Sequence, residues 1–314
     1  MSTRPVLLAA GAAVSLLLVG CGSSTSASSP STSATTAAAV STTVAPTTST
    51  TPRGSGPVDV LYAGSLVTVM TDTIGPAFDA ATGYTFTGFS AGSDALATQI
   101  KGKVRQGDVF VSASPTVNAS LEGAANGGWV SWYATFATAP LVIGYNPKSR
   151  FAADLQSKPW YQVVTEPGFL LGRTDPATDP KGKLAVSALN SAASAQNLPA
   201  LAALATSSSG VYPEETLVGR LQAGQLDAGF FYSSEARAAS IPTVPVTGQS
   251  LKATYTVTVL NQAPDEAGAE AFVAYLLGPA GQAALKSDGF ELVTPVTVSG
   301  GGVPSSISSV ISAP

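Results

Sequence analysis

Short β-rich runs that end in a glycine–serine turn and lead into a helical segment open the part of this chain that can fold. Residues 58–63 (VDVLYA) form the first run, and Gly64 and Ser65 follow it before a helical pattern. The same order returns with an alternating strand expected over 84–89 and a helix expected over 95–103. Strand, turn, helix and strand in this order are typical of a parallel α/β sheet.

A second block of strands and helices begins near Pro140. Its expected elements are a strand at 141–146, a helix after Pro180, a helix at 214–223, strands at 228–232 and 254–260, and helices at 266–277 and 279–287. Two α/β blocks, with the last elements returning to the first block, predict two lobes with a ligand in the cleft between them. The expected division is lobe 1 at 58–138 and 247–300, lobe 2 at 139–246, and a loose tail at 301–314.

The first twenty residues indicate a secretory signal. Arg4 is the only charge among them, and it precedes an apolar run of about 16 residues, shorter than the roughly 20 that a membrane span needs. Leu18-Val19-Gly20-Cys21 resembles the bacterial lipobox, which implies that Cys21 is lipidated and begins the mature chain. The alternative is an ordinary signal peptide (1–20) with an incidental cysteine.

Residues 21–57 are expected to form a flexible tether between lipid and domain. From residue 22 the segment consists almost wholly of Ser, Thr, Ala, Pro and Gly, with Arg53 as its only charge and no aromatic residue. Such a composition cannot bury enough apolar surface to offset the entropy of ordering.

The composition of the chain removes several classes of function. It contains no histidine and one cysteine, which excludes Ser-His-Asp and Cys-His machinery, imidazole-ligated zinc and a disulfide framework. A formal charge of -4 and a pI of about 4.8 argue against nucleic acid as a partner.

Two serines, Ser65 and Ser93, follow strands and open helices. A helix start offers unpaired N–H groups and a partial positive charge, and a serine hydroxyl adds a further donor, so both positions suit an oxyanion. The simpler alternative is that both serines only cap their helices.

Three further residues have both a structural and a functional interpretation. Asp179 precedes Pro180 and fits an N-cap, while Glu214 fits a first-turn acid that stabilises a helix dipole. Tyr232 ends the strand expected at 228–232, where its ring could lie in the core or its hydroxyl could face a cleft.

Several short stretches then occur in the order of one protein family. They are residues 63–66 (AGSL), Gly92-Ser93, 108–113 (DVFVSA), 136–147 (FATAPLVIGYNP), 172–176 (GRTDP) with Asp179-Pro180, the stretch 221–232, and Gly289-Phe290. Together they resemble the molybdate/tungstate-binding proteins of ABC importers over residues 58–298.

The resemblance implies a type II periplasmic-binding-protein fold, which is α/β and two-lobed, with the oxyanion in the inter-lobe cleft. Ser65 and Ser93 match the family's hydroxyl donors, and Tyr232 matches a tyrosine that closes the site. In the tungstate-type branch an aspartate and a glutamate, here Asp179 and Glu214, are direct ligands of Mo or W.

The chain departs from the family pattern beside Asp179 and leaves a second candidate beside Glu214. Lys181 stands where the family usually has cysteine, and Glu215 is an alternative to Glu214 for the glutamate. Six-coordinate and tetrahedral binding of the metal centre therefore both remain open.

The expected function is an extracytoplasmic lipoprotein, anchored through Cys21 to the outer face of the bacterial cell membrane. It would capture molybdate or tungstate and deliver it to an ABC permease and its ATPase, as a monomer without cofactor, catalysis or nucleic-acid partner. One alternative is a receptor for another oxyanion, such as sulfate or phosphate, or for a small carboxylate. Others are a surface hydrolase using Ser65 or Ser93, for which the chain has no His base or Ser-x-x-Lys spacing, and a stalked adhesion protein.

Overall fold

The computed structural model describes residues 54–312, which belong to one compact unit of the chain. Cys21, the expected signal peptide and nearly all of the expected tether lie outside the described residues. Within 54–312, no helix combines the length and the apolar character needed to cross a bilayer.

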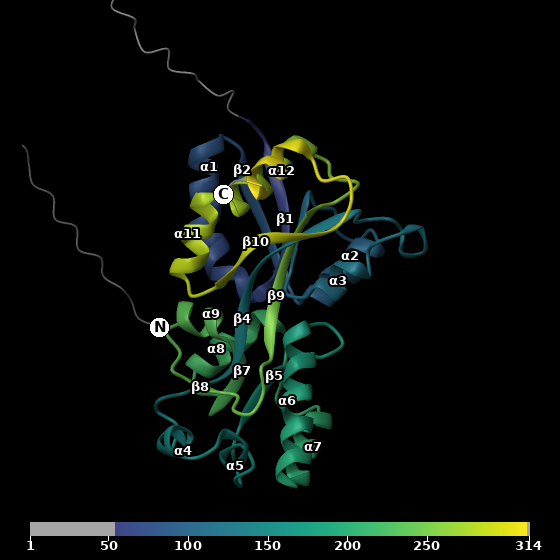
Figure 1. The fold of residues 1–314 in the computed structure, drawn as a ribbon. Coiled ribbons are helices and arrows are strands. Elements are labelled where there is room, and N and C mark those ends of the chain that lie inside the picture. Colours follow the sequence, from purple (N-terminus) through teal and green to yellow (C-terminus); the bar gives the residue numbers. More distant parts are fainter. Residues whose placement is uncertain (1–53, 313–314) are drawn as a thin grey trace, which may run out of the picture. The chain divides into compact units, whose positions relative to one another are not determined.

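A mixed ten-stranded sheet organises the described residues (Figure 1). Its path runs β2-β1-β3-β9-β4-β7-β5-β6, with β8 and β10 also paired to β4. Strands β1, β2 and β3 are parallel to one another, while β9 is antiparallel to both β3 and β4. The strands are β1 (Pro57–Ala63), β2 (Thr85–Ala91), β3 (Val109–Ser112), β4 (Trp132–Tyr145), β5 (Leu171–Thr174), β6 (Val211–Tyr212), β7 (Ala228–Tyr232), β8 (Thr243–Pro245), β9 (Lys252–Val259) and β10 (Glu291–Gly300).

The long strand β4 joins two halves of this sheet. Up to Pro140 it pairs with β9, and from Leu141 it pairs with β7. We call β1, β2, β3, β9 and β10 with their helices the first half, and β5 to β8 with theirs the second half. The chain passes between the halves at β4 and again between β8 and β9, close to the expected lobe boundaries, which stay a prediction.

Helices cover both halves of the sheet (Figure 1). Helices α10 and α11 have the bounds expected from the sequence, whereas the first expected helix is divided into a short 3₁₀ turn (η1), a π-helical segment (η2) and α1. The helices are η1 (Gly64–Leu66), η2 (Val69–Ile74), α1 (Gly75–Thr82), α2 (Ser93–Lys101), α3 (Pro115–Ala119), η3 (Ala124–Asn126), α4 (Ala152–Ser157), α5 (Trp160–Val163), α6 (Pro180–Gln196), α7 (Pro199–Thr206), η4 (Glu214–Thr216), α8 (Leu217–Gln222), α9 (Ser233–Ala238), α10 (Glu266–Leu277), α11 (Pro279–Ser287) and α12 (Ser305–Ile311).

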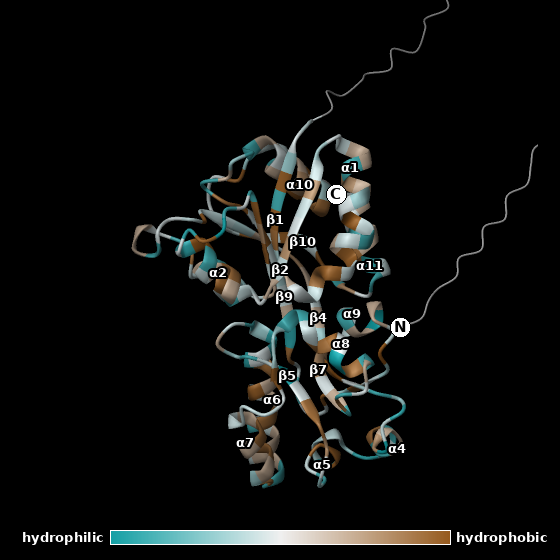
Figure 2. Ribbon diagram, turned by 180° about the vertical axis from the view of Figure 1, so that it is seen from behind, coloured by the Kyte–Doolittle hydropathy of each residue, from teal (hydrophilic) through white to brown (hydrophobic). Residues whose placement is uncertain are grey.

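One large apolar core extends through both halves. Strand β1 is buried on both faces, as expected for a central parallel strand, and Figure 2 shows hydrophobic residues along it and along α10. The Phe78 ring of α1 meets the Phe272 ring of α10 edge to face, with centroids 5.2 Å apart. The Phe272 ring also stacks on Phe86 at the amino end of β2, whereas the two glycine–serine turns follow the carboxyl ends of β1 and β2.

The C-terminal segment differs from its expected loose state. Strand β10 pairs with β4 through Gly300, and the chain then forms α12, which contacts α10 and buries Ile307. The Ser- and Gly-rich composition concealed this helix, although Ile307 is buried and Val303, Val310 and Ile311 also pack against the core.

Candidate functional site

The two glycine–serine turns lie side by side at one edge of the sheet. Strands β1 and β2 are parallel neighbours with Ala63 paired to Ala91, so the turns that follow them meet. Ser65 and Ser93 are both buried. Ser65 is the second residue of η1, and Ser93 is the first residue of α2. Neither side chain caps the start of its helix by a hydrogen bond. The helix-capping interpretation of these serines is therefore wrong.

The serine hydroxyls have different partners. The Ser65 Oγ and the Tyr255 hydroxyl of β9 are 3.0 Å apart and share a hydrogen bond. The Ala113 N–H donates to the Ser93 Oγ over 3.1 Å, which leaves the Ser93 proton free to be donated elsewhere. Within residues 54–312, neither serine hydroxyl is hydrogen-bonded to a carboxylate or another general base.

Three residues from the second half approach these turns. Asp179 is the N-cap of α6, as expected, and its carboxylate accepts the Lys181 N–H. Glu214 opens η4 and is 5% exposed, whereas the adjacent Glu215 is exposed, so Glu214 is the member of the pair that lies at this site. Tyr232 ends β7 and is fully buried.

The halves are in direct contact around the two glycines. A Cβ added to Gly64 would lie 2.2 Å from the Glu214 Oε2, and one added to Gly92 would lie 2.3 Å from the Thr178 carbonyl oxygen. The Ala95 N–H donates to the same carbonyl over 3.0 Å. The structure thus brings Ser65 next to Glu214 and Ser93 next to Asp179.

Adding a methyl group at Gly92 tests this approach. The Gly92 φ of -57° suits alanine, so Gly92→Ala should leave the first half folded but force the halves apart at Thr178. Overpacking of this kind costs about 1–3 kcal/mol, or roughly 5- to 150-fold in affinity for a ligand held between them. Calorimetric titration checks this, with Gly219→Ala as the control because a Cβ there meets no atom within 4 Å. Equal affinity in the Gly92 variant would contradict the proposed approach.

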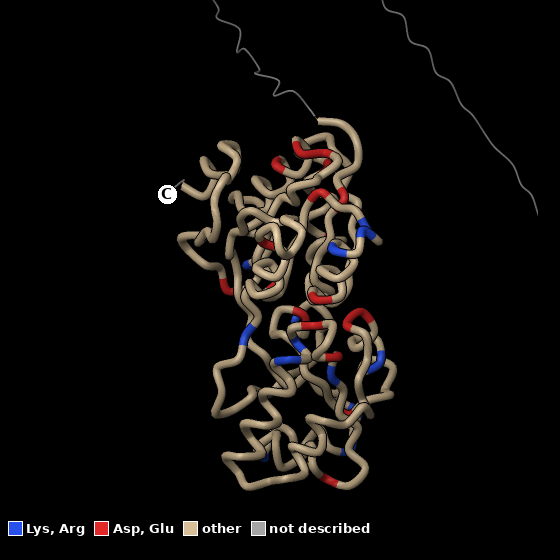
Figure 3. Tube along the Cα trace, turned by 90° about the vertical axis from the view of Figure 1, so that its right-hand side faces the viewer, with Lys and Arg blue, Asp and Glu red and all other residues tan. Residues whose placement is uncertain are grey.

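A buried cluster of charges lies behind Glu214. The Lys181 Nζ donates to the Glu214 Oε1 over 2.8 Å and to the Glu235 Oε2 and Oε1 over 2.7 and 2.9 Å. About half-way down the trace in Figure 3, blue basic and red acidic positions lie close together. Neither Glu235 nor the ion-pairing role of Lys181 was predicted from the sequence.

The cluster changes the protonation of its carboxyl groups. Burial raises the pKa of Asp179 to about 8, with the nearby Glu214 carboxylate adding to the effect. Burial likewise raises the pKa of Glu235 to about 7. Desolvation opposes the Lys181 charge, but Glu214 and Glu235 outweigh it and raise the lysine pKa above its usual value. These shifts favour the protonated form of Asp179 in the anion-free site and the charged form of Lys181.

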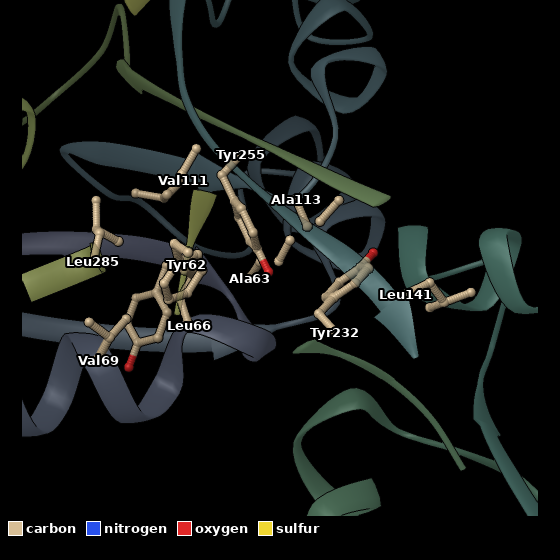
Figure 4. Close-up of a cluster of buried hydrophobic side chains, with 14 of the residues drawn as sticks. Tyr62, Ala63, Leu66, Val69, Val111, Ala113, Leu141, Tyr232, Tyr255 and Leu285 are labelled. Atoms are coloured by element: carbon tan, nitrogen blue, oxygen red, sulfur yellow. The ribbon is translucent and has the colours of Figure 1, made fainter. Parts of the chain in front are cut away.

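Two tyrosines complete the site (Figure 4). The rings of Tyr232 and Tyr255 meet edge to face with centroids 6.1 Å apart. Burial raises the pKa of both phenols, so both remain donors. The Tyr232 hydroxyl is buried and, among the described residues, has no hydrogen-bond partner. Tyr255 was missed because it lies in a regular alternating strand, which carried no sign of function.

The arrangement favours an anion with several oxygen atoms. Ser93, Tyr232 and one of the hydrogen-bonded pair Ser65 and Tyr255 each have a hydroxyl proton available for a ligand. An unpartnered buried hydroxyl is costly unless a ligand pairs with it. The Glu214 Oε2 is also buried and without a partner among the described residues. Within 54–312, no group of three or more acidic or cysteine side chains is arranged to hold a metal ion.

Comparisons with known proteins identify the family. The model for bacterial extracellular solute-binding proteins matches residues 58–291. The chain belongs to this family. A putative ABC transporter molybdenum-binding protein of Haloferax volcanii is 32% identical over 70% of this chain and 66% of its own length. A molybdate/tungstate-binding protein, WtpA, of Thermococcus kodakarensis is 25% identical over 58% of this chain and 66% of its own. The chain thus matches just under two thirds of each of these relatives.

Solved structures of solute-binding proteins share the fold. The periplasmic molybdate-binding protein of Azotobacter vinelandii matches 76% of this chain and 100% of its own with a TM-score of 0.61 at 21% identity. The sulfate-binding protein SubI of Mycobacterium tuberculosis matches 76% of this chain and 88% of its own with a TM-score of 0.56 at 16% identity. The expected α/β periplasmic-binding-protein fold is confirmed.

Proposed function

We propose that this solute-binding protein captures molybdate or tungstate outside the cytoplasm and delivers it to an ABC permease that is driven by an ATPase. The observation that carries the proposal is the buried Tyr232 hydroxyl, which has no partner among the described residues. Its ring contacts Tyr255, the hydrogen-bond partner of Ser65, and the turn that carries Ser65 lies beside the turn that carries Ser93. The names of the Haloferax and Thermococcus relatives support the same ligand class.

The donor set suits a fully deprotonated oxyanion. Molybdate and tungstate carry two charges and no proton at neutral pH, so each of their oxygens needs a donor. Phosphate retains a proton under these conditions, and the unpartnered Glu214 Oε2 is an acceptor for it, so the hydroxyl donors alone do not exclude phosphate. The hydroxyls of the first half supply donors without adding a cation.

Sulfate has the same charge and shape as molybdate, so a second feature must reject it. We propose that Asp179 and Glu214 do so, because a carboxylate oxygen repels a sulfate oxygen but can ligate a Mo or W centre. One oxygen from each carboxylate, added to the four oxygens of the anion, would make the metal centre six-coordinate. Alternatively, a protonated Asp179 donates to a tetrahedral anion.

The attachment to the membrane and the partners are part of the same proposal. Lipidation at Cys21 would anchor the protein through several acyl chains, which gives stable attachment.

Closure of the halves on the ligand would be the signal that the permease reads. The protein would act as a monomer without catalysis. The mass of the N-terminal peptide of the mature protein tests the lipid.

A thermal-shift panel of molybdate, tungstate, sulfate, phosphate and chromate tests the ligand class. A ligand at about 100 times its dissociation constant adds about 2.7 kcal/mol to the free energy of unfolding, which for a domain of this size raises Tm by roughly 5–10 °C. We expect the largest shifts with molybdate and tungstate. A larger shift with sulfate or phosphate would favour a receptor for another oxyanion, and no shift at all would contradict the proposal.

A further inference from the structure

Lys181 occupies a position that helix stability does not explain. It is the second residue of α6 and fully buried, although a cation in the first turn of a helix opposes the helix dipole. The helix start is pressed against the preceding loop, since a Cβ on Gly182 would lie 2.6 Å from the Pro176 backbone nitrogen. The direction in which Lys181 leaves the helix is therefore fixed.

The Lys181 ammonium bonds two carboxylates. One contact goes to the Glu214 Oε1 at 2.8 Å, and two go to the Glu235 carboxylate at 2.7 and 2.9 Å. The Glu235 Oε2 also accepts the Tyr232 N–H over 3.3 Å. The Nζ lies 5.6 Å from the centroid of the Tyr232 ring. Lys181 thus connects Glu214 of η4 with the end of β7 that carries Tyr232.

The lysine leaves Glu214 with one oxygen engaged and one free. The Oε1 is held by the ammonium, while the Oε2 has no partner among the described residues and lies against Gly64. A carboxylate that could rotate freely would present either oxygen, or both, toward the first half. Held this way, it presents a single oxygen in one direction.

We propose that Lys181 is a positioning residue that sets oxyanion specificity, by fixing Glu214 with one oxygen facing the ligand and by tying it through Glu235 to the Tyr232 segment. This inference rests on the proposed function of the site. The ammonium also offsets the negative charge of Glu214 and Glu235, which would otherwise repel any anion bound nearby.

The test is calorimetric titration of the full-length chain with molybdate and with sulfate, comparing Lys181→Met with Lys286→Met. Lys286 lies on the exposed side of α11, so the control removes the same charge away from the site. Loss of a residue that orients a ligand group costs about 10- to 100-fold in affinity. We expect that loss for molybdate in Lys181→Met, a smaller loss for sulfate, and no change in Lys286→Met.

A double variant keeps the test valid if Lys181→Met does not fold. Lys181→Met with Glu235→Gln removes one buried negative charge together with the lysine, so that folding is restored while Glu214 stays unpositioned. We expect its ratio of molybdate to sulfate affinity to remain at least 10-fold below that of the unmodified protein. An unchanged ratio in either folded variant would overturn the inference and leave the proposed function standing. Failure of the unmodified protein to bind any oxyanion would instead overturn the proposed function.

Discussion

Replacing Tyr232 by Phe is expected to lower the affinity for molybdate about 10- to 100-fold while leaving the free energy of unfolding of the unliganded protein unchanged. The hydroxyl has no partner among the described residues, so its removal breaks no hydrogen bond within them. A hydrogen bond to a charged ligand contributes about 1.5–3 kcal/mol, which is the size of the expected loss. Calorimetric titration and urea unfolding without anion measure the two effects separately.

The matched control is Tyr275→Phe. Tyr275 lies on α10, packs on the core through its ring and is only partly buried, so the same loss of a hydroxyl should not change anion affinity. Unchanged affinity in Tyr232→Phe would remove Tyr232 from the site. A loss of stability above about 2 kcal/mol would show that its hydroxyl has a partner within the folded protein.

The second large effect is expected from Glu214→Gln, which should lower the ratio of molybdate to sulfate affinity by about 10- to 100-fold. The amide keeps the shape of the side chain and can still accept from Lys181, which also retains Glu235. It replaces an oxygen that repels sulfate by an N–H that donates to it. Asp179→Ala and Glu214→Ala should likewise weaken selectivity against sulfate more than they weaken folding.

Glu215→Gln is the control for this substitution. It makes the same chemical change one residue away on an exposed side chain and should leave the ratio unchanged. X-ray absorption at the edge of the bound metal, compared between the unmodified protein and Glu214→Gln, reports the oxygen shell directly. If Glu214→Gln has the same selectivity as the unmodified protein, and the bound metal has four oxygens in both proteins, Glu214 is not a ligand.

The parts of the fold predicted from sequence are those that local signals control. Helices α10 and α11 begin and end as expected because the residues that start and stop them stand directly at their ends: Asp265 and Gly278 flank α10, and Pro279 opens α11. The turns after β1 and β2 are equally local. The length of β4 and the docking of α12 depend on partners far along the chain, so no local pattern revealed them.

The candidate site divides in the same way. Ser65, Ser93, Asp179, Glu214 and Tyr232 stand at strand or helix ends, where sequence patterns are informative. Tyr255 contacts Ser65 across 190 positions, and Glu235 contacts Lys181 across 54. A tyrosine in a regular strand and a first-turn glutamate have ordinary local roles, so only the tertiary structure shows that they belong to the site.

The most direct test is a crystal of this protein grown with tungstate, examined by anomalous scattering from tungsten. The account predicts a single strong peak between the two halves, with oxygens of the anion within hydrogen-bonding distance of the Ser65, Ser93 and Tyr232 hydroxyls. A strong peak elsewhere, or an empty site at saturating tungstate, would contradict it.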